Sequence, residues 1–524
     1  MGPNLRVRSS PERGPAAAKP SSRSPLQEHA GDTESPPGYQ VQMLLLCALA
    51  AAASLDNLEI GGPWGSPTST DGTAGWWNPA GFAVGKGTRI MLEGAYEDAK
   101  ITFDRDEPHG GADTYRLSGF PPYFGLASTL GKVGPGQLGV GAVFALPFIR
   151  GGIEDSPPGT GHYHMKDGDT KGMWMGVGVA YDVQNVVSIG VTGALVHSIW
   201  AAEVDQDTLP DLRAAMLATG ATDEMLGFTE ADLEDPDYMA QLDFGGSEGG
   251  LSGNGELSDD TFSFAAGVLV HPSDNFAVGV TYVHSAVVEN TGDVDITFGC
   301  VSAEKNSLAR IVAETRGVCD TTVHADGYLG YTLPRRVHGG VMVRPIDPLR
   351  LEIMGGWVQW SEYSDFHIKV SNADVEGTTE AFTEEAKALI EQERDWARAN
   401  EDTFWAALDA KVKLPRRFTV GARYWFDHAA VPDEALSANN WDADAHIISG
   451  LVAYKPTKFL EVGVSYTHHF VAERTIDNSA FSNPLDITSA EDRWRYPHGN
   501  GTYNGSIDRV GLQLRGHFGK EKAE

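Results

Sequence analysis

The sequence predicts an all-β fold, a transmembrane barrel of 14 antiparallel strands with a short N-terminal plug and helical extracellular loops. Three observations lead to this prediction. Segments of about ten to eighteen residues in which apolar and polar side chains alternate recur from Gly87 onward, and a period of two is typical of strands. The connections between them are short and long in turn, as in bacterial outer-membrane barrels. No apolar run reaches the roughly 18 residues that a membrane-spanning helix needs.

Residues 459–470 show the alternation clearly. The odd positions from Glu461 to His469 are small or polar, and the even positions are Leu460, Val462, Val464, Tyr466, His468 and Phe470. The same division occurs in 137–148, 187–199 and 275–282. In a barrel the apolar face meets lipid, and aromatic residues near its edges form an interfacial girdle.

We expect the strands at 87–104, 113–131, 136–149, 171–182, 185–200, 259–271, 274–292, 335–345, 348–370, 402–414, 416–428, 441–455, 458–473 and 501–518. The segment 402–414 is spaced as well for a helix, but closure of a barrel favours an even number of strands. Residues 383–400 and parts of 207–243 are expected to form loop helices.

Loop lengths distinguish a barrel from a two-sheet sandwich. Five connections are short, namely 131–136, 182–185, 271–275, 344–348 and 455–458. Six are long, namely 150–170, 201–258, 293–333, 371–401, 429–440 and 474–500. A sandwich would not keep short turns on one rim and long loops on the other over more than ten strands.

The first 54 residues are expected to be a leader. Residues 1–42 are rich in Pro and Ser without apolar periodicity, which predicts disorder. An apolar run of about eleven residues follows from Met43, the length of a signal-peptide core. Cleavage near Ala53 or Ser54 would leave an exported protein with a plug at 55–86, a barrel at 87–518 and a tail at 519–524.

The formal net charge is −32, and it is unevenly distributed. Between Ala201 and Asp260 there are sixteen Asp or Glu residues and a single basic residue, Arg213. An acidic surface repels phosphate backbones, so we expect no nucleic-acid partner. The segment is interpreted either as a solvated loop or as a place where divalent cations bridge carboxylates to anionic surface lipids.

Cys300 and Cys319 flank a polar segment and could close one loop as a disulfide in an oxidising compartment. The alternative is two unpaired thiols. Leu46 before Cys47 is too large for a good lipoprotein cleavage site, so no lipid anchor is expected.

Candidates for catalysis or metal binding are weak. The pairs His162 and His164, and His468 and His469, have no convincing third ligand at a known spacing. The sequence contains no His-Glu-x-x-His motif and no phosphate-binding loop. We therefore expect no catalytic residue, metal or cofactor, and a protein that is not an enzyme, with a hydrolase site at a barrel rim as the open alternative.

One motif precedes the first strand. It runs from Asp71 through small residues and two tryptophans to Asn78-Pro79-Ala80-Gly81. By itself Asn-Pro predicts a turn. Followed by fourteen strands, the motif resembles that of the FadL/TodX family of outer-membrane long-chain fatty-acid and aromatic-hydrocarbon transporters, in which it closes an N-terminal plug. Residues 138–148, 264–288, 333–366, 417–432 and 501–518 are similar to further segments of that family, in the same order.

The resemblance implies passive transport of hydrophobic small molecules, most of all long-chain fatty acids, across the bacterial outer membrane. Ligand would pass from the long loops to a pocket in the barrel, and then through a lateral opening once the plug shifts. Each buried methylene favours capture by roughly 0.8 kcal/mol. The residues implied in the plug and its gating are Asp71, Trp77, Asn78, Pro79, Ala80 and Gly81. Loop candidates for ligand capture, which alternatively pack the loop's own helices, are Leu209, Leu212, Met216, Leu217, Phe228 and Phe244.

The expected partners are the hydrophobic ligand, outer-membrane lipid, lipopolysaccharide and the barrel-assembly machinery, with the protein itself a monomer. A general porin and a surface adhesin or receptor are the alternatives. Only about two dozen residues separate Ser54 from Asn78, which is shorter than the family's plug, so gating could differ.

Overall fold

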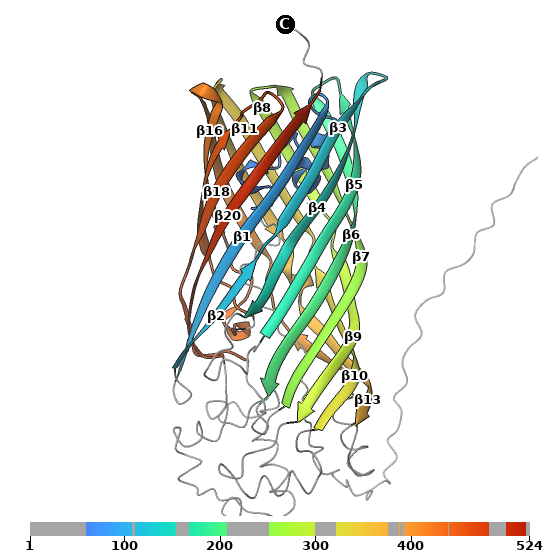
Figure 1. Cartoon of the computed structure of the whole chain (residues 1–524), viewed down its shortest axis with the longest axis vertical. Helices are drawn as coiled ribbons and strands as arrows, with labels where there is room; N and C mark the ends of the chain where they lie inside the picture. Colours follow the sequence, from blue (N-terminus) through green and yellow to red (C-terminus); the bar gives the residue numbers. More distant parts are fainter. Residues whose placement is uncertain are drawn as a thin grey trace, which may run out of the picture. The chain divides into compact units, whose positions relative to one another are not determined.

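The computed structural model of the protein describes residues 59–106, 111–153, 167–206, 251–298, 321–375, 387, 391, 393–438, 440–480 and 499–519. Within them a single sheet contains twenty strand segments (Figure 1). Their bounds are β1 Thr88–Arg105, β2 Gly111–Gly119, β3 Pro122–Val133, β4 Gly136–Ile153, β5 Asp167–Val183, β6 Val187–Gln206, β7 Leu251–Ser273, β8 Phe276–Val283, β9 Ala286–Phe298, β10 Thr321–Leu333, β11 Arg336–Ile346, β12 Leu349–Val358, β13 Asp365–Val375, β14 Glu393–Ala397, β15 Thr403–Leu414, β16 Phe418–Asp427, β17 Ala445–Tyr454, β18 Leu460–Val471, β19 Arg474–Ile476 and β20 Gly501–Phe518.

Antiparallel pairing closes this sheet into a barrel. The first and last strands pair along their whole length, from Thr88 opposite Phe518 to Arg105 opposite Gly501. Six segments, β3, β9, β11, β13, β15 and β19, continue the segment before them across a short interruption, so the wall has 14 strands. The predicted fold class, a 14-stranded antiparallel barrel, is confirmed.

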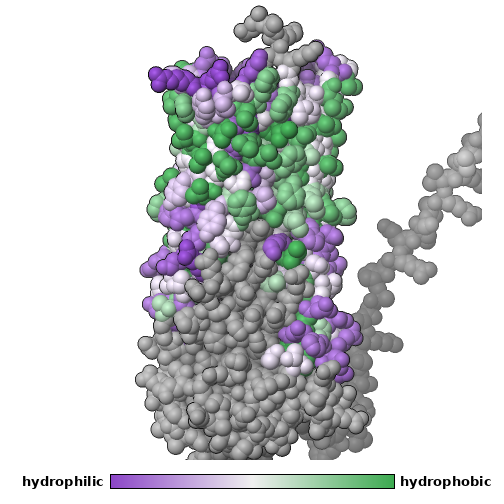
Figure 2. Space-filling view, viewed as in Figure 1, coloured by the Kyte–Doolittle hydropathy of each residue, from purple (hydrophilic) through white to green (hydrophobic). Residues whose placement is uncertain are grey.

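Alternate residues of each strand face outward or into the lumen. In β17 every second residue is buried, while the outward-facing Ile448 and Val452 are more than half exposed. Figure 2 shows the outward-facing hydrophobic residues as a band near the rim of short turns, with hydrophilic residues beyond it along the strands. This is the surface that a lipid bilayer requires of a barrel.

The ambiguous segment 402–414 is a strand, β15, as predicted. The helix expected over 383–400 is wrong for Glu393–Ala397, which forms β14 and pairs with β13. The long connection expected over 293–333 is also too long, because β9 continues to Phe298 and β10 begins at Thr321. The helices expected in 207–243 lie outside the described residues.

Residues 59–86, called here the inner segment, lie within the barrel towards the short-turn end (Figure 1, blue). They contain three short helices, η1 Gly62–Trp64, α1 Ala74–Trp77 and η2 Pro79–Ala83. Pro79 fixes its own φ and cannot continue α1, so Asn78 is extended and a new turn starts there. No helix in the described part of the chain is long and apolar enough to cross a membrane.

Candidate functional site

Asn78 organises the centre of the inner segment. Its side-chain oxygen accepts a hydrogen bond from the Ala80 backbone amide at 3.1 Å and so caps η2. Its side-chain nitrogen donates to the carbonyl of Pro67 at 2.9 Å and to the carbonyl of Val268 in β7 at 3.0 Å. One buried amide thus joins two turns of the inner segment to the barrel wall.

Where the inner segment contacts the barrel wall, several of the inward-facing residues of the wall are glycines, which have no side chain. A Cβ at Gly190 in β6 would lie 2.5 Å from the carbonyl carbon of Pro79, and one at Gly267 in β7 would overlap the side chain of Asn78. Only glycine allows so close an approach of two backbones. Ser188, two residues before Gly190, donates to the carbonyl of Ala80 at 2.7 Å. Other inward-facing glycines that contact the inner segment are Gly125, Gly139, Gly141, Gly178 and Gly279.

Trp77 is fully buried and is bound on two sides. Its indole nitrogen donates to the carbonyl of Ile60 at 3.0 Å, which folds the segment back on itself. Its own carbonyl accepts from Thr281 in β8 at 2.8 Å and from His338 in β11 at 2.7 Å. The satisfied buried carbonyl fixes the end of α1 against the wall.

Asp71 lies on the opposite side of the inner segment and pairs with Arg515 of β20. It also accepts hydrogen bonds from the amide and hydroxyl of Thr73, at 2.9 and 2.6 Å. Burial alone would raise the pKa of Asp71, but Arg515 and Thr73 outweigh it and lower this pKa to about 2. Asp71 is therefore a carboxylate across the physiological pH range.

Long charged side chains span the gap on this side of the segment. Arg423 in β16 donates to the carbonyl of Gly65 at 2.5 Å and pairs with Asp409 at 2.8 Å. Glu59 pairs with Arg509 and His469, each at 3.3 Å. Burial raises the pKa of Glu59, but Arg509 and His469 together lower it to about 2.

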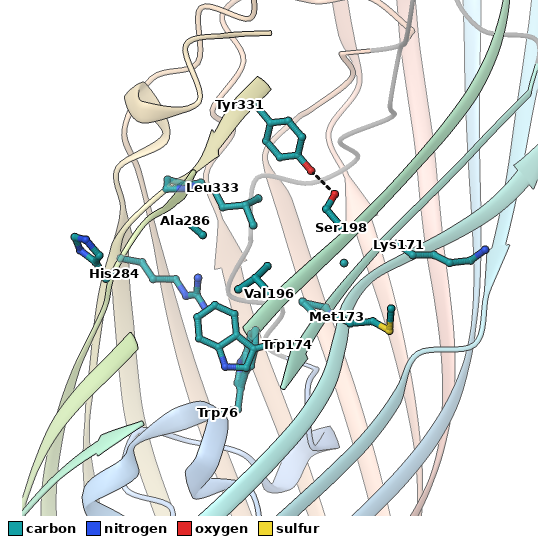
Figure 3. A pocket seen from close by; sticks show the side chains of 14 residues that line it. Trp76, Lys171, Met173, Trp174, Val196, Ser198, His284, Ala286, Tyr331 and Leu333 are labelled. Atoms are coloured by element: carbon teal, nitrogen blue, oxygen red, sulfur yellow. Dashed lines mark hydrogen bonds between the residues drawn. The ribbon is translucent and has the colours of Figure 1, made fainter. Parts of the chain in front are cut away.

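An apolar cavity of about 40 Å³ lies where the inner segment meets β5, β6, β10 and β11 (Figure 3). Trp76 and Trp174 contact edge to face in its wall, with ring centres 5.8 Å apart. The guanidinium of Arg336 lies 5.1 Å from the Trp76 ring and 5.9 Å from the Trp174 ring. Trp76, Trp174 and Arg336 are all buried, so the cavity combines an aromatic wall with a fixed cation.

The barrel wall is interrupted beside this cavity. Pairing of β3 with β4 ends at Tyr123 opposite Ala145 and resumes, in β2, only at Ser118 opposite Gly151. On the other edge of β4 a bulge follows Ala145. Prolines at 121, 122 and 147 cannot donate to a ladder, which accounts for the break. Pro147 also lines the cavity.

The six motif residues predicted for plug and gating, Asp71, Trp77, Asn78, Pro79, Ala80 and Gly81, all lie in the inner segment. The loop residues predicted for ligand capture, Leu209, Leu212, Met216, Leu217, Phe228 and Phe244, lie outside the described residues, as do Cys300 and Cys319.

Arg336 and Trp174 were not predicted as site residues. No local pattern marks an isolated Arg or Trp in a strand, and only the closed sheet brings them to Trp76.

The two histidine pairs do not meet as metal ligands in the described structure. His468 faces outward and pairs with Asp508 at 2.8 Å, whereas His469 faces the lumen and pairs with Glu59. His162 and His164 lie outside the described residues. No group of three or more His, Cys, Asp or Glu residues that could hold a metal ion occurs in the part of the chain that the structure describes.

Residues 46–515 match the family described as outer membrane protein transport protein (OMPP1/FadL/TodX). The fold is similar to a FadL homologue from Pseudomonas aeruginosa, with a TM-score of 0.63 and 14% identity over 90% of this chain and 99% of that one. The toluene transporter TodX from Pseudomonas putida gives a TM-score of 0.54 and 11% identity, also over 90% and 99%. The toluene transporter TbuX from Ralstonia pickettii gives 0.50 and 12%, over 86% and 95%. No curated protein matches the chain by sequence.

Proposed function

The chain belongs to the outer membrane protein transport family (OMPP1/FadL/TodX), barrels of the bacterial outer membrane that transport hydrophobic molecules, and we propose that its own ligand is a long-chain fatty acid. Lipopolysaccharide hinders direct entry of apolar solutes, so a protein route is needed. Movement along this route is passive.

The observation that carries the fatty-acid assignment is a buried cation in an aromatic cavity. Arg336 lies beside both Trp76 and Trp174, and the rest of the lining includes Met173, Val196 and Leu333. A guanidinium binds a carboxylate through two parallel hydrogen bonds, while the apolar wall of this small cavity contacts the methylenes next to the carboxylate. An aromatic hydrocarbon would use the wall but would have no group for Arg336.

The inner segment acts as the plug in this proposal, and its motif residues fasten it. Asn78 and Trp77 bind the backbone and side chains of β7, β8 and β11, while Asp71 binds β20. These contacts are hydrogen bonds and ion pairs rather than continuous strand pairing, so they can be exchanged without opening the barrel. Gating then consists of a shift of residues 59–86 against a fixed wall.

The interruption beside β4 supplies the exit. Between Ala145 and Gly151 the ladder with the neighbouring strand is missing, and Phe120 on that neighbour is 59% exposed. An apolar ligand leaving there would enter the bilayer directly rather than cross water. Pro147 lines both the cavity and this break, which makes the route short.

An uptake assay tests the proposal. Cells without the gene, carrying either an empty vector or the wild-type gene, are given radiolabelled oleate, toluene or a small sugar. We expect the gene to restore oleate uptake selectively. If the gene restores only the uptake of toluene, the ligand is an aromatic hydrocarbon instead. If it restores the uptake of the sugar, the protein is a general porin. If the gene changes the uptake of none of them, the transport proposal is wrong.

A further inference from the structure

A second and larger cavity, of about 800 Å³, lies on the other side of the inner segment. Residues 68–71 and 84–86 of the inner segment form one side of it, and the short turns at Asp274, Asp347 and Lys455 form its rim. Short turns face the periplasm in outer-membrane barrels. We call this cavity the periplasmic vestibule. Its volume is within the range of sites that hold a whole small ligand.

The vestibule is rich in positive charges that the described structure does not neutralise. Some of its cations are paired, as Arg350 is with Glu352 and Arg515 with Asp71. Seven others have no ion-pair partner among the described residues, namely Lys86, Arg89, Arg344, Lys413, Arg417, Lys455 and Lys458. The vestibule carboxylates without an ion-pair partner among the described residues are Asp274 and Asp347.

This excess is the reverse of the charge on the chain as a whole, which is −32. Like charges gathered round one cavity repel each other and raise the local positive potential. An anion entering the vestibule would reduce that repulsion, and a concave site with low-dielectric walls concentrates the field. The lining therefore favours an anionic occupant.

Part of the vestibule lining is apolar. Leu269, Ala277 and Met342 form one buried cluster with Val84 packed against it, and all four line the vestibule. Inorganic anions would gain nothing from this patch, whereas a hydrocarbon chain would be dehydrated there. The cationic rim and the apolar interior of the vestibule together fit a molecule with an anionic head and an apolar tail.

We propose that the periplasmic vestibule is a binding site for an anionic amphiphile whose head is a carboxylate or a phosphate. It is separate from the cavity of Arg336, because the two cavities have no lining residue in common. The head lies among Lys413, Lys455 and Lys458 at the rim, and the tail lies against Met342. The occupant enters from the periplasm or from the inner leaflet of the membrane.

Binding to the purified full-length protein in an uncharged maltoside detergent tests this site by isothermal titration calorimetry. The probes are octanoate, octyl phosphate, octanol and inorganic phosphate. The test variant is Lys413→Glu with Lys458→Glu, which reverses two exposed charges of the vestibule. The matched control is Lys100→Glu with Lys132→Glu, two exposed lysines that do not line it.

We expect octanoate and octyl phosphate to bind the wild type and the control alike, and to bind the test variant at least about tenfold more weakly. Octanol and inorganic phosphate should bind much more weakly than either amphiphile. Tighter octyl phosphate binding supports a phospholipid source, and equal or tighter octanoate binding supports a fatty acid. The proposal is overturned if the test variant binds like the control, or if inorganic phosphate binds as tightly as octyl phosphate.

One further variant separates this site from the proposed fatty-acid cavity. In a protein that already carries Arg336→Gln, the double substitution Lys413→Glu with Lys458→Glu should still weaken the binding of octyl phosphate. If the Arg336 change alone removes all anion binding, the vestibule is not a site, whereas the fatty-acid proposal would stand.

Discussion

The guanidinium carbon of Arg336 in β11 lies 5.1 Å from the centre of the Trp76 ring in the inner segment. Both residues line the 40 Å³ cavity, so the cation that would bind a ligand also holds the inner segment to the wall. A carboxylate that draws Arg336 away weakens this contact. Ligand binding and release of the inner segment are thereby coupled, since a ligand shifts an equilibrium by its differential affinity for the two states.

Replacing Arg336 tests the ligand class. Arg336→Gln removes the cation, and hydrogen bonds to charged groups contribute about 1.5–3 kcal/mol, so oleate should bind roughly ten- to a hundredfold more weakly. Toluene binding should be unchanged, and Arg336→Lys should recover part of the oleate affinity. Calorimetry on the purified variants measures this, with Arg116→Gln on the outer face as the control. An equal loss for oleate and toluene would mean that Arg336 is only structural.

Adding a methyl group at a glycine of the barrel wall that contacts the inner segment should displace that segment. In Gly190→Ala the new Cβ would meet the Pro79 backbone at 2.5 Å, and overpacking of this kind costs about 1–3 kcal/mol. The amides of residues 80–83 should exchange hydrogen faster, and conductance in planar bilayers should rise. Gly193→Ala in the same strand is the control, because nothing lies within 4 Å of its Cβ. Identical exchange in the two variants would show that the close contact is unimportant.

Acid should loosen the inner segment through Glu59. Its pKa falls from 4.5 to about 2 on folding, so the pairing with Arg509 and His469 contributes stability above pH 4.5 that is lost as the pH falls towards 2. Bilayer conductance should rise over that range. Glu59→Gln should be conducting already at pH 7, because breaking a buried ion pair costs about 3–5 kcal/mol. The control Glu401→Gln, at an exposed position, should behave like the wild type. If Glu59→Gln shows the same pH dependence of conductance as the wild type, the Glu59 carboxylate is not the group that fastens the inner segment.

The loop between β16 and β17 should respond to pH in the opposite direction. Burial raises the pKa of Asp442 to about 7, although the amides of Ala430 and Val431 and the charge of Arg474 oppose the shift. A carboxyl group whose pKa is raised by folding stabilises the folded state fully below pH 3.8, and this contribution is lost as the pH rises through 7. The protection of the amides in 428–438 against hydrogen exchange, relative to their intrinsic exchange rates, should therefore fall between pH 5 and 8. Asp442→Asn should flatten this dependence, and an unaltered pH profile in that variant would disprove the assignment.

The barrel could be predicted from sequence because its signal is local. Alternation in 459–470 depends only on which face meets lipid, and closure then required 402–414 to be a strand. The outer parts of the wall were missed for the same reason. Where β9 and β10 extend beyond the apolar band, both strands carry polar residues outward, such as Asp295 opposite His324. The apolar alternation is therefore absent there.

The residues of the candidate site could be predicted only where their contacts are with residues nearby in the sequence. Asn78 could be recognised because a residue before proline that also caps the next turn is a local event. Arg336 could not, because its partners Trp76 and Trp174 are far away in the chain and meet it only when the sheet closes. Likewise, the glycines that contact the inner segment are spread over several strands, and no one of them is informative alone.

The two sides of the inner segment are fastened by different means. Towards β4–β8 its backbone lies directly on glycine. Towards β16 and β20 the gap is bridged by arginine and glutamate side chains, among which a cavity of about 10 Å³ borders Glu59, Arg423 and Arg509. That is room for about one water molecule. Any ions that leak through the closed protein would cross on this side, where charges of both signs line the way. Such a leak would discriminate little between cations and anions, and its size would follow side-chain rotamers rather than movement of the backbone.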